Sequence, residues 1–180
     1  MSEKGVIDLF YADETHISSE GYVPYGWHSM WDKFPDEKVA IYVEKGHKIN
    51  ILGLISRQNH CHFKTTEANI TSGFICEFFE DLSFKITKET VVAWDNASIH
   101  CAKIIQERKS IWEQRGLFLV ALPPYSPHLN IAETLWRKIK AEWLVPEDYL
   151  EKDTLFYAAN RCMANIGKEL TINFKKFSLN

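Results

Sequence analysis

Two short apolar runs, at residues 90–94 and 117–122, constrain the fold of this chain of 180 residues more than any other feature. Neither run shows polar alternation, and the first is rich in β-branched residues, which is typical of strands covered on both faces of a sheet. The residues between them, from about 98 to 114, have a helical pattern that Gly116 ends. A strand, a helix and a strand in this order predict two parallel neighbours joined by a right-handed crossover.

Further elements are predicted on either side of this unit. Apolar residues that recur at fours predict a helix over about 67–82, and Gly46 is expected to turn a hairpin between strands at 39–43 and 48–55. The other expected elements are strands at 6–12 and 61–64 and helices at about 130–143 and 154–167. A hairpin-rich beginning followed by alternating strands and helices predicts an α/β or α+β fold with mixed strand pairing.

The composition is that of a soluble globular domain, with 46% hydrophobic and 25% charged residues. No apolar run approaches the ~18 residues of a membrane span and no signal peptide is recognisable, so we expect a cytoplasmic protein with no membrane partner. The formal charge of −3 divides into −6 over residues 1–95 and +3 over residues 96–180. Because domains that bind polyanions are usually basic, this balance argues against a tight, self-sufficient DNA-binding module.

Three acidic residues stand where the predicted elements would bring them to one edge of the sheet. Asp13 directly follows the expected strand at 6–12, Asp95 follows the run at 90–94, and Glu133 lies in the first turn of a helix. Ligands of open α/β sheets bind in the crevice at the carboxyl ends of the strands. Three carboxylates there repel one another unless cations join them, and hard oxygen ligands suit Mg²⁺ or Mn²⁺. Two such ions, roughly 3.5–4 Å apart, can clamp both oxygens of a phosphodiester displacement.

Each of these residues also has a structural interpretation. An aspartate after a strand is often only a turn former or a helix cap. The spacing of Asn130 and Glu133 fits a capping box, in which Glu133 reaches back to the Asn130 amide, and from spacing alone this is the favoured account. Glu14, next to Asp13, faces the other way if the extended conformation persists, so at most one of the two faces the crevice.

The sequence around these acids resembles the DDE superfamily of transposases. The resemblance lies in Trp94-Asp-Asn-Ala-Ser-Ile-His100 and in Leu122-Pro-Pro-Tyr-Ser-Pro-His-Leu-Asn-Ile-Ala-Glu133. It is strongest to the bacterial insertion-sequence transposases related to the mariner group, and it covers about residues 9–143. Three upstream segments are similar to the family's earlier motifs: Tyr11-Ala-Asp13-Glu14, Pro24-Tyr-Gly-Trp27 and Lys48-Ile-Asn-Ile-Leu-Gly53.

The resemblance implies a fold, a site and an activity. The fold would be ribonuclease-H-like, a mixed five-stranded sheet flanked by helices. Asp13, Asp95 and Glu133 would be the catalytic residues and the ligands of two Mg²⁺ or Mn²⁺ ions. The activity would be DNA nicking at the ends of the element, which leaves a 3′ hydroxyl, and strand transfer to target DNA, with the protein on the nucleoid when bound. Residues expected to orient a carboxylate or contact DNA are Asn96, His100, Asn130, Arg137 and Lys138.

Two departures from the family pattern bear on this expectation. Ile131 and Ala132 replace a Pro-Ile pair, and since proline there aids helix entry without being a ligand, the chemistry is unaffected. The family's N-terminal helix-turn-helix region has no counterpart here, because the sequence begins almost at the first strand. We therefore expect a single DDE catalytic domain over 1–180, with a core at about 6–145 and a C-terminal helical extension at 150–180. Recognition of the ends would fall to a separate N-terminal DNA-binding polypeptide, and a homodimer on DNA suits a reaction that handles two ends.

Two other functions remain open at this point. A ribonuclease H or a junction resolvase would share the fold and the carboxylates, but it gives no account of the Pro-Pro-Tyr-Ser-Pro segment. A non-catalytic remnant or split-frame product would bind DNA or a partner transposase through its surface. The presence of all three acids argues against the second alternative.

Overall fold

The computed structural model describes residues 5–19, 46–95, 103–123 and 129–174. One mixed sheet lies at its centre, with the strand order β3-β2-β1-β4-β5. The strands are β1 (Asp8–Ser18), β2 (Lys48–Ile55), β3 (Cys61–Thr66), β4 (Thr90–Trp94) and β5 (Leu117–Ala121). Pairing is antiparallel from β1 to β2 and from β2 to β3, and parallel from β1 to β4 and from β4 to β5. The expected mixed five-stranded sheet is confirmed, whereas the strand expected at 39–43 lies outside the described residues.

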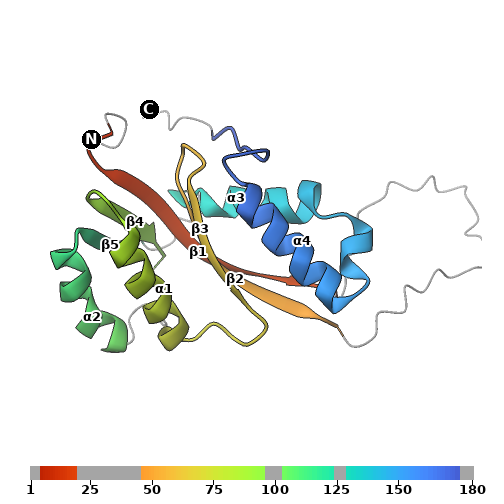
Figure 1. Cartoon of the computed structure of the whole chain (residues 1–180), viewed down its shortest axis with the longest axis horizontal. Helices are drawn as coiled ribbons and strands as arrows, with labels where there is room; N and C mark the ends of the chain where they lie inside the picture. The colour runs from red at the N-terminus through yellow and green to blue at the C-terminus, as the bar shows by residue number, and fades with distance from the viewer. Residues whose placement is uncertain (1–4, 20–45, 96–102, 124–128, 175–180) are drawn as a thin grey trace, which may run out of the picture.

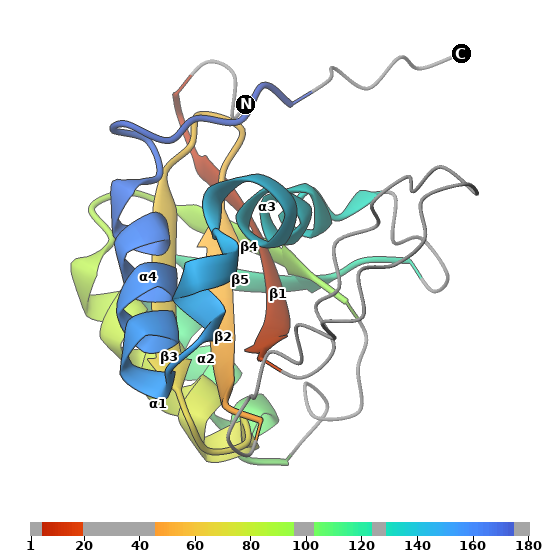
Figure 2. The ribbon, with the colours of Figure 1, turned by 90° about the vertical axis from the view of Figure 1, so that its right-hand side faces the viewer.

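Helices cover both faces of the sheet (Figures 1 and 2). They are α1 (Ser72–Lys85), α2 (Lys103–Gln114), α3 (Ala132–Lys138), the π-helical turn η4 (Ile139–Trp143), the 3₁₀ turn η5 (Pro146–Tyr149) and α4 (Lys152–Asn165). The side chains of α1 and α2 share a buried cluster with alternate residues of the strands, such as Phe10 and Ala12. Those of α3 and α4 share a second cluster with the residues between, such as Tyr11 and Ile17. The period of two along β1 therefore divides the core into two layers.

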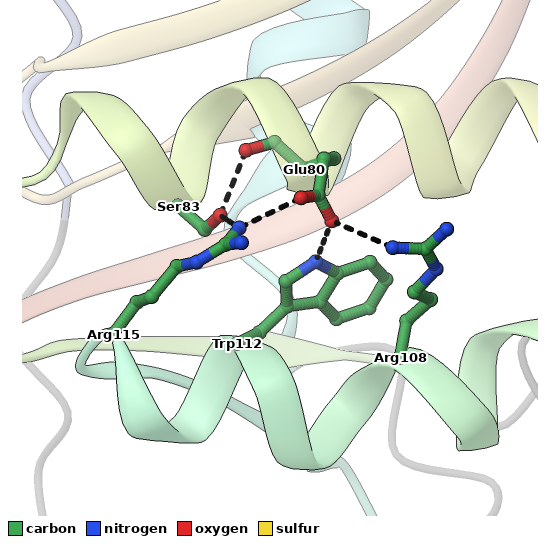
Figure 3. Close-up of polar contacts among 5 residues, drawn as sticks. All are labelled: Glu80, Ser83, Arg108, Trp112 and Arg115. Carbon is green, nitrogen blue, oxygen red and sulfur yellow. Dashed lines mark hydrogen bonds and ion pairs between the residues drawn. The ribbon is translucent and has the colours of Figure 1, made fainter.

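A polar cluster joins α1 to α2 on the face of the sheet that these two helices cover (Figure 3). The Glu80 carboxylate accepts hydrogen bonds from Trp112 Nε1 at 2.9 Å and from Arg115 at 2.7 Å. Arg108 lies at 3.8 Å from the same carboxylate. These bonds hold the pKa of Glu80 below its usual value, with the Arg115 bond the largest cause.

The expected end of the first strand and the expected start of the first helix are wrong. The first strand was expected to end at residue 12, but β1 continues to Ser18. All of β2 pairs with this part of β1, from Tyr11↔Ile55 to Ser18↔Lys48. The helix expected from residue 67 begins at Ser72, since the Thr71 hydroxyl accepts from Phe74 N and caps it. The residues before it are held out of the helix by an Asn50 side chain that donates to the Ala68 carbonyl.

The helix expected at 130–143 is interrupted. A regular helix spans only Ala132–Lys138, and its continuation over Ile139–Trp143 widens to a π-helical turn before the chain extends at Leu144. The last helix begins at Lys152, two residues earlier than expected, and ends at Asn165. In the portion of the chain that the structure describes, no helix has both the length and the apolar character needed to cross a membrane.

Candidate active site

Asp13 and Asp95 lie side by side at the carboxyl edge of the parallel part of the sheet. The register of β1 with β4 pairs Tyr11 with Ala93, so two residues further along each strand Asp13 stands level with Asp95. β4 has ended at that point, whereas β1 continues. The expectation that these two carboxylates meet at one edge is therefore met, although Asp13 lies within its strand rather than after it.

The Asp13 carboxyl is in a strongly perturbed environment. Its pKa is raised from 3.8 to about 6, chiefly by burial and in addition by the charges of Glu14 and Asp95, while hydrogen bonds from Trp136 and the Glu14 backbone oppose the rise. The Asp95 charge thus acts on Asp13 directly. A half-buried acid next to a second carboxylate is the arrangement that a bound cation would relieve.

Trp136 on α3 makes the direct contact with Asp13. Its indole Nε1 donates to Asp13 Oδ2 at 2.9 Å. The ring lies over Gly53, which is the cross-strand partner of Asp13 in β2. A Cβ atom on Gly53 would come within 2.5 Å of the ring atom Cη2. Trp136 is not among the site residues expected from the sequence, although a buried indole N–H ordinarily needs an acceptor.

Asn130 fixes the beginning of α3 against β1. Its side chain is 6% exposed, its Nδ2 donates to the Ala12 carbonyl at 3.0 Å, and its Oδ1 accepts from the Ala132 amide at 3.1 Å. Both ends of the amide are therefore engaged with the backbone next to Asp13. Asn130 thus ties the start of α3 to the β1 backbone at Ala12, next to Asp13.

Glu133 lies in the first turn of α3 with an exposed side chain. Among the described residues the capping-box bond from the Asn130 amide to the Glu133 side chain is not formed, and it is the Asn130 side chain that accepts from the Ala132 amide. Glu133 precedes Trp136 by three residues, which places the two on the same side of the helix. Within the described residues, no three His, Cys, Asp or Glu side chains lie close enough to hold a metal ion, so Glu133 does not join Asp13 and Asp95 in this conformation.

Basic side chains follow Glu133 along α3 and η4. Lys140 in η4 is half-buried, and burial lowers its pKa while the Asp13 charge opposes this shift, so the two groups are near one another. Arg137 is exposed, and Lys138 forms an ion pair of 2.6 Å with Glu142. The positions expected at Asn96 and His100 lie outside the described residues.

A hard divalent cation fits the Asp13 and Asp95 pair. Both groups offer carboxylate oxygens, Asp95 is exposed to solvent that can supply further ligands, and the perturbed pKa of Asp13 marks the electrostatic cost that a cation removes. The described sheet thus presents an acidic edge with lysine nearby, an arrangement suited to metal-assisted chemistry on a phosphodiester.

A sequence-family profile described as DDE superfamily endonuclease matches residues 8–155. The chain belongs to the DDE superfamily of endonucleases. The match includes Asp13, Asp95 and Glu133, together with the Asn130 and Trp136 side chains that surround Asp13. No curated protein sequence matches this DDE domain at a significant level.

Solved structures agree with the ribonuclease-H-like fold of the DDE domain. The Mos1 mariner paired-end complex with Mn aligns with a TM-score of 0.55 at 14% identity, over 87% of this chain and 48% of that chain. The catalytic domain of Mos1 mariner transposase aligns with a TM-score of 0.52 at 12% identity, over 87% of this chain and 69% of that one. At these identities the likeness establishes the fold. The DDE domain spans only 46% to 58% of the length of several matched chains.

Proposed function

We propose that this DDE domain is the catalytic domain of an insertion-sequence transposase that nicks DNA and transfers the cut strand. The observation that carries the proposal is the level placement of Asp13 and Asp95 at the carboxyl edge of β1 and β4. Membership of an endonuclease superfamily supports the cleavage step. The transfer step rests on the resemblance to mariner-related transposases.

Asp13, Asp95 and Glu133 would hold two Mg²⁺ or Mn²⁺ ions. When bound, such ions lower the pKa of a water molecule and offset charge on the phosphodiester. Asp13 enters the site with its orientation set by Trp136 and Asn130. In the first expected step a water oxygen bonds to phosphorus as the P–O3′ bond breaks, which leaves a 3′ hydroxyl and a 5′ phosphate. In the second step that hydroxyl bonds to a target phosphorus and displaces the 3′ oxygen of the target strand.

Glu133 must turn toward the two aspartates for all three to act together. Trp136, on the same side of α3 and one turn further along, already contacts Asp13. A change of side-chain rotamer in the first turn of the helix is therefore the movement that the proposal requires. Arg137, Lys138 and Lys140 follow on the same segment and would contact phosphates beside the cut.

DNA is the proposed substrate and partner, as element ends and as target. One of the similar structures is a Mos1 paired-end complex, which supports the idea that a homodimer of this chain forms on DNA. Recognition of the ends by a separate N-terminal DNA-binding polypeptide belongs to the same proposal. A cytoplasmic, nucleoid-associated location follows from a DNA substrate.

Nicking of supercoiled plasmid tests the catalytic proposal. We expect Mg²⁺ or Mn²⁺ to support nicking, and Asp95→Asn to abolish it because one oxygen ligand is lost. Asp153→Asn, on the exposed first turn of α4, is the matched control and should retain activity. Equal activity of the wild type and Asp95→Asn would overturn the proposal.

Two alternatives are separated by the choice of substrate and by stability. Efficient hydrolysis of the RNA strand of an RNA–DNA hybrid would identify a ribonuclease H in place of a transposase. A remnant that only binds DNA should show no change of thermal stability with metal. The catalytic proposal expects millimolar Mg²⁺ to raise the unfolding temperature, since a ligand that binds only the native state stabilises it.

A further inference from the structure

The indole of Trp136 occupies a space that exists because residue 53 has no side chain. Gly53 is buried in β2 and pairs across the strands with Asp13. An added Cβ would meet Cη2 of the ring at 2.5 Å and the Met163 methyl of α4 at 3.3 Å. The ring thus lies against Gly53, in the buried cluster that it shares with Met163, with its N–H aimed at the Asp13 carboxylate.

We propose that Gly53 and Trp136 form a positioning pair that holds Oδ2 of Asp13 and leaves Oδ1 directed at a divalent cation. The inference rests on the proposed function, since it takes Asp13 to be a metal ligand. Gly53 and Trp136 are positioning residues, because both act through Asp13 and neither offers a ligand atom.

The torsion that turns a carboxylate about its own axis is broad when nothing restrains it. Trp136 removes that freedom at Asp13 by binding one oxygen at 2.9 Å. Donors of this kind, which bind the ligand rather than the metal, commonly set the orientation of ligating side chains. The fixed ring explains why this donor is an indole: a flexible donor would have to be ordered itself before it could order Asp13.

A second tryptophan in the same chain provides a contrast. Trp112 Nε1 also donates to a carboxylate at 2.9 Å, that of Glu80 (Figure 3). Glu80 is in addition paired with two arginines, so its charge is balanced within the protein. Asp13 forms no ion pair within the described residues and receives only a neutral N–H from its side-chain partner. A half-buried carboxylate that is oriented by a neutral donor and forms no ion pair is one prepared for a cation.

The contact itself can be tested without metal. The six tryptophans give six indole signals in a two-dimensional proton–nitrogen NMR spectrum, and Trp136→Phe assigns one of them. We expect Asp13→Asn to move the Trp136 signal and to leave the Trp112 signal in place. An unmoved Trp136 signal would overturn the proposed contact.

Metal affinity then tests positioning. Mn²⁺ is titrated into metal-free protein by calorimetry, and its paramagnetic broadening of the Trp136 signal reports where it binds. We expect Trp136→Phe to weaken Mn²⁺ binding roughly 10- to 100-fold, as removal of a donor to a metal ligand typically does. Trp112→Phe, which loses the same N–H on the other face of the sheet, should bind as the wild type does.

Two further variants separate positioning from packing. Gly53→Ala retains the indole but displaces it, and it is expected to weaken Mn²⁺ binding as Trp136→Phe does. Trp136→His retains a ring N–H and should recover part of the affinity. The remaining indole signals report whether each variant is folded.

The failures are distinguishable. If Mn²⁺ leaves the Trp136 signal of the wild type unbroadened, Asp13 is not a metal ligand and the proposed function fails. If the wild type binds Mn²⁺ at this site and folded Trp136→Phe binds it equally well, only the positioning pair is overturned. Loss of affinity in both Trp136→Phe and Gly53→Ala, with Trp112→Phe unaffected, supports the pair.

Discussion

At the scale of single residues, Asp13 illustrates what a strand pattern can and cannot reveal. Its place beside Asp95 followed from two apolar strands and the rule that parallel strands end at one edge. Its contacts did not, because they depend on the register of β2 and on helix α3, more than a hundred residues away. Gly53 and Trp136 carry no reactive group, so a search for reactive side chains passes over both.

The pKa of Asp13 predicts how the metal-free protein responds to pH. The pKa of Asp13 is about 6 in the native state, above its ordinary value of 3.8. Between these two pH values the native state therefore binds more protons than the unfolded state does. This contribution to stability is present below the unfolded pKa and is lost as pH rises through the native one. Asp13→Asn should therefore gain stability relative to the wild type as the pH rises from about 4 to about 6. Urea unfolding with a chelator present measures the difference, and a difference independent of pH would contradict it.

Asn130 carries a stability prediction. Asn130→Ala would leave the Ala12 carbonyl and the Ala132 amide unpaired in a buried place. We expect a loss of roughly 2–4 kcal/mol in the free energy of unfolding, since each orphaned buried group costs about 1–3 kcal/mol. Asn165→Ala, which removes an exposed bond to the Arg161 carbonyl, is the control and should cost well under half as much.

At the scale of elements, the accuracy of a predicted boundary depended on local sequence contrast. The strand at 90–94 was predicted to the residue, because a short apolar run between polar residues leaves little choice of boundary. The start of α1 was missed because Thr71 offers a cap inside an otherwise periodic stretch. The π-helical turn after α3 has no periodic signature, since it is set by packing against α4 and η5.

The polar cluster between α1 and α2 can be tested with two arginines of the same helix region. Arg115→Met removes a hydrogen bond of 2.7 Å to Glu80 and a cation–π contact with Phe84. Because these side chains are partly exposed, we expect a loss of only about 1 kcal/mol. Arg108→Met removes a guanidinium that lies 3.8 Å from Glu80, and it should cost less than half of that by chemical denaturation.

The contribution of Glu80 to the free energy of unfolding should fade as pH falls below about 4.5, since the pKa of Glu80 is lowered in the native state.

At the scale of the whole molecule, α4 decides whether the chain unfolds as one unit. We predicted a core at about 6–145 with a helical extension, and in the structure the buried residues of α4 share a cluster with β1, β2 and α3. If that cluster is one cooperative unit, damage to α4 should destabilise the sheet as well.

One substitution on each face of α4 tests whether the cluster unfolds as one cooperative unit. Ala159 is fully buried and Ala164 is exposed. Ala159→Glu should destabilise the whole chain severely, by more than about 3 kcal/mol, because it buries an unpaired charge. Ala164→Glu should change stability by less than about 0.5 kcal/mol. A thermal transition of Ala159→Glu that retains the sheet signal would show instead that α4 is a separable appendage.

The absence of a side chain at Gly53 has a consequence for the comparison of distant relatives of this domain. The proposed positioning pair predicts that a relative with all three acids binds metal poorly if alanine replaces the glycine, because the alanine methyl group takes the place of the Trp136 ring. Conversely, a paralogue that has exchanged the indole for a smaller ring would tolerate alanine there. The two positions should therefore change together, and a glycine on a strand with no chemistry of its own becomes a diagnostic of whether the neighbouring acid is still usable.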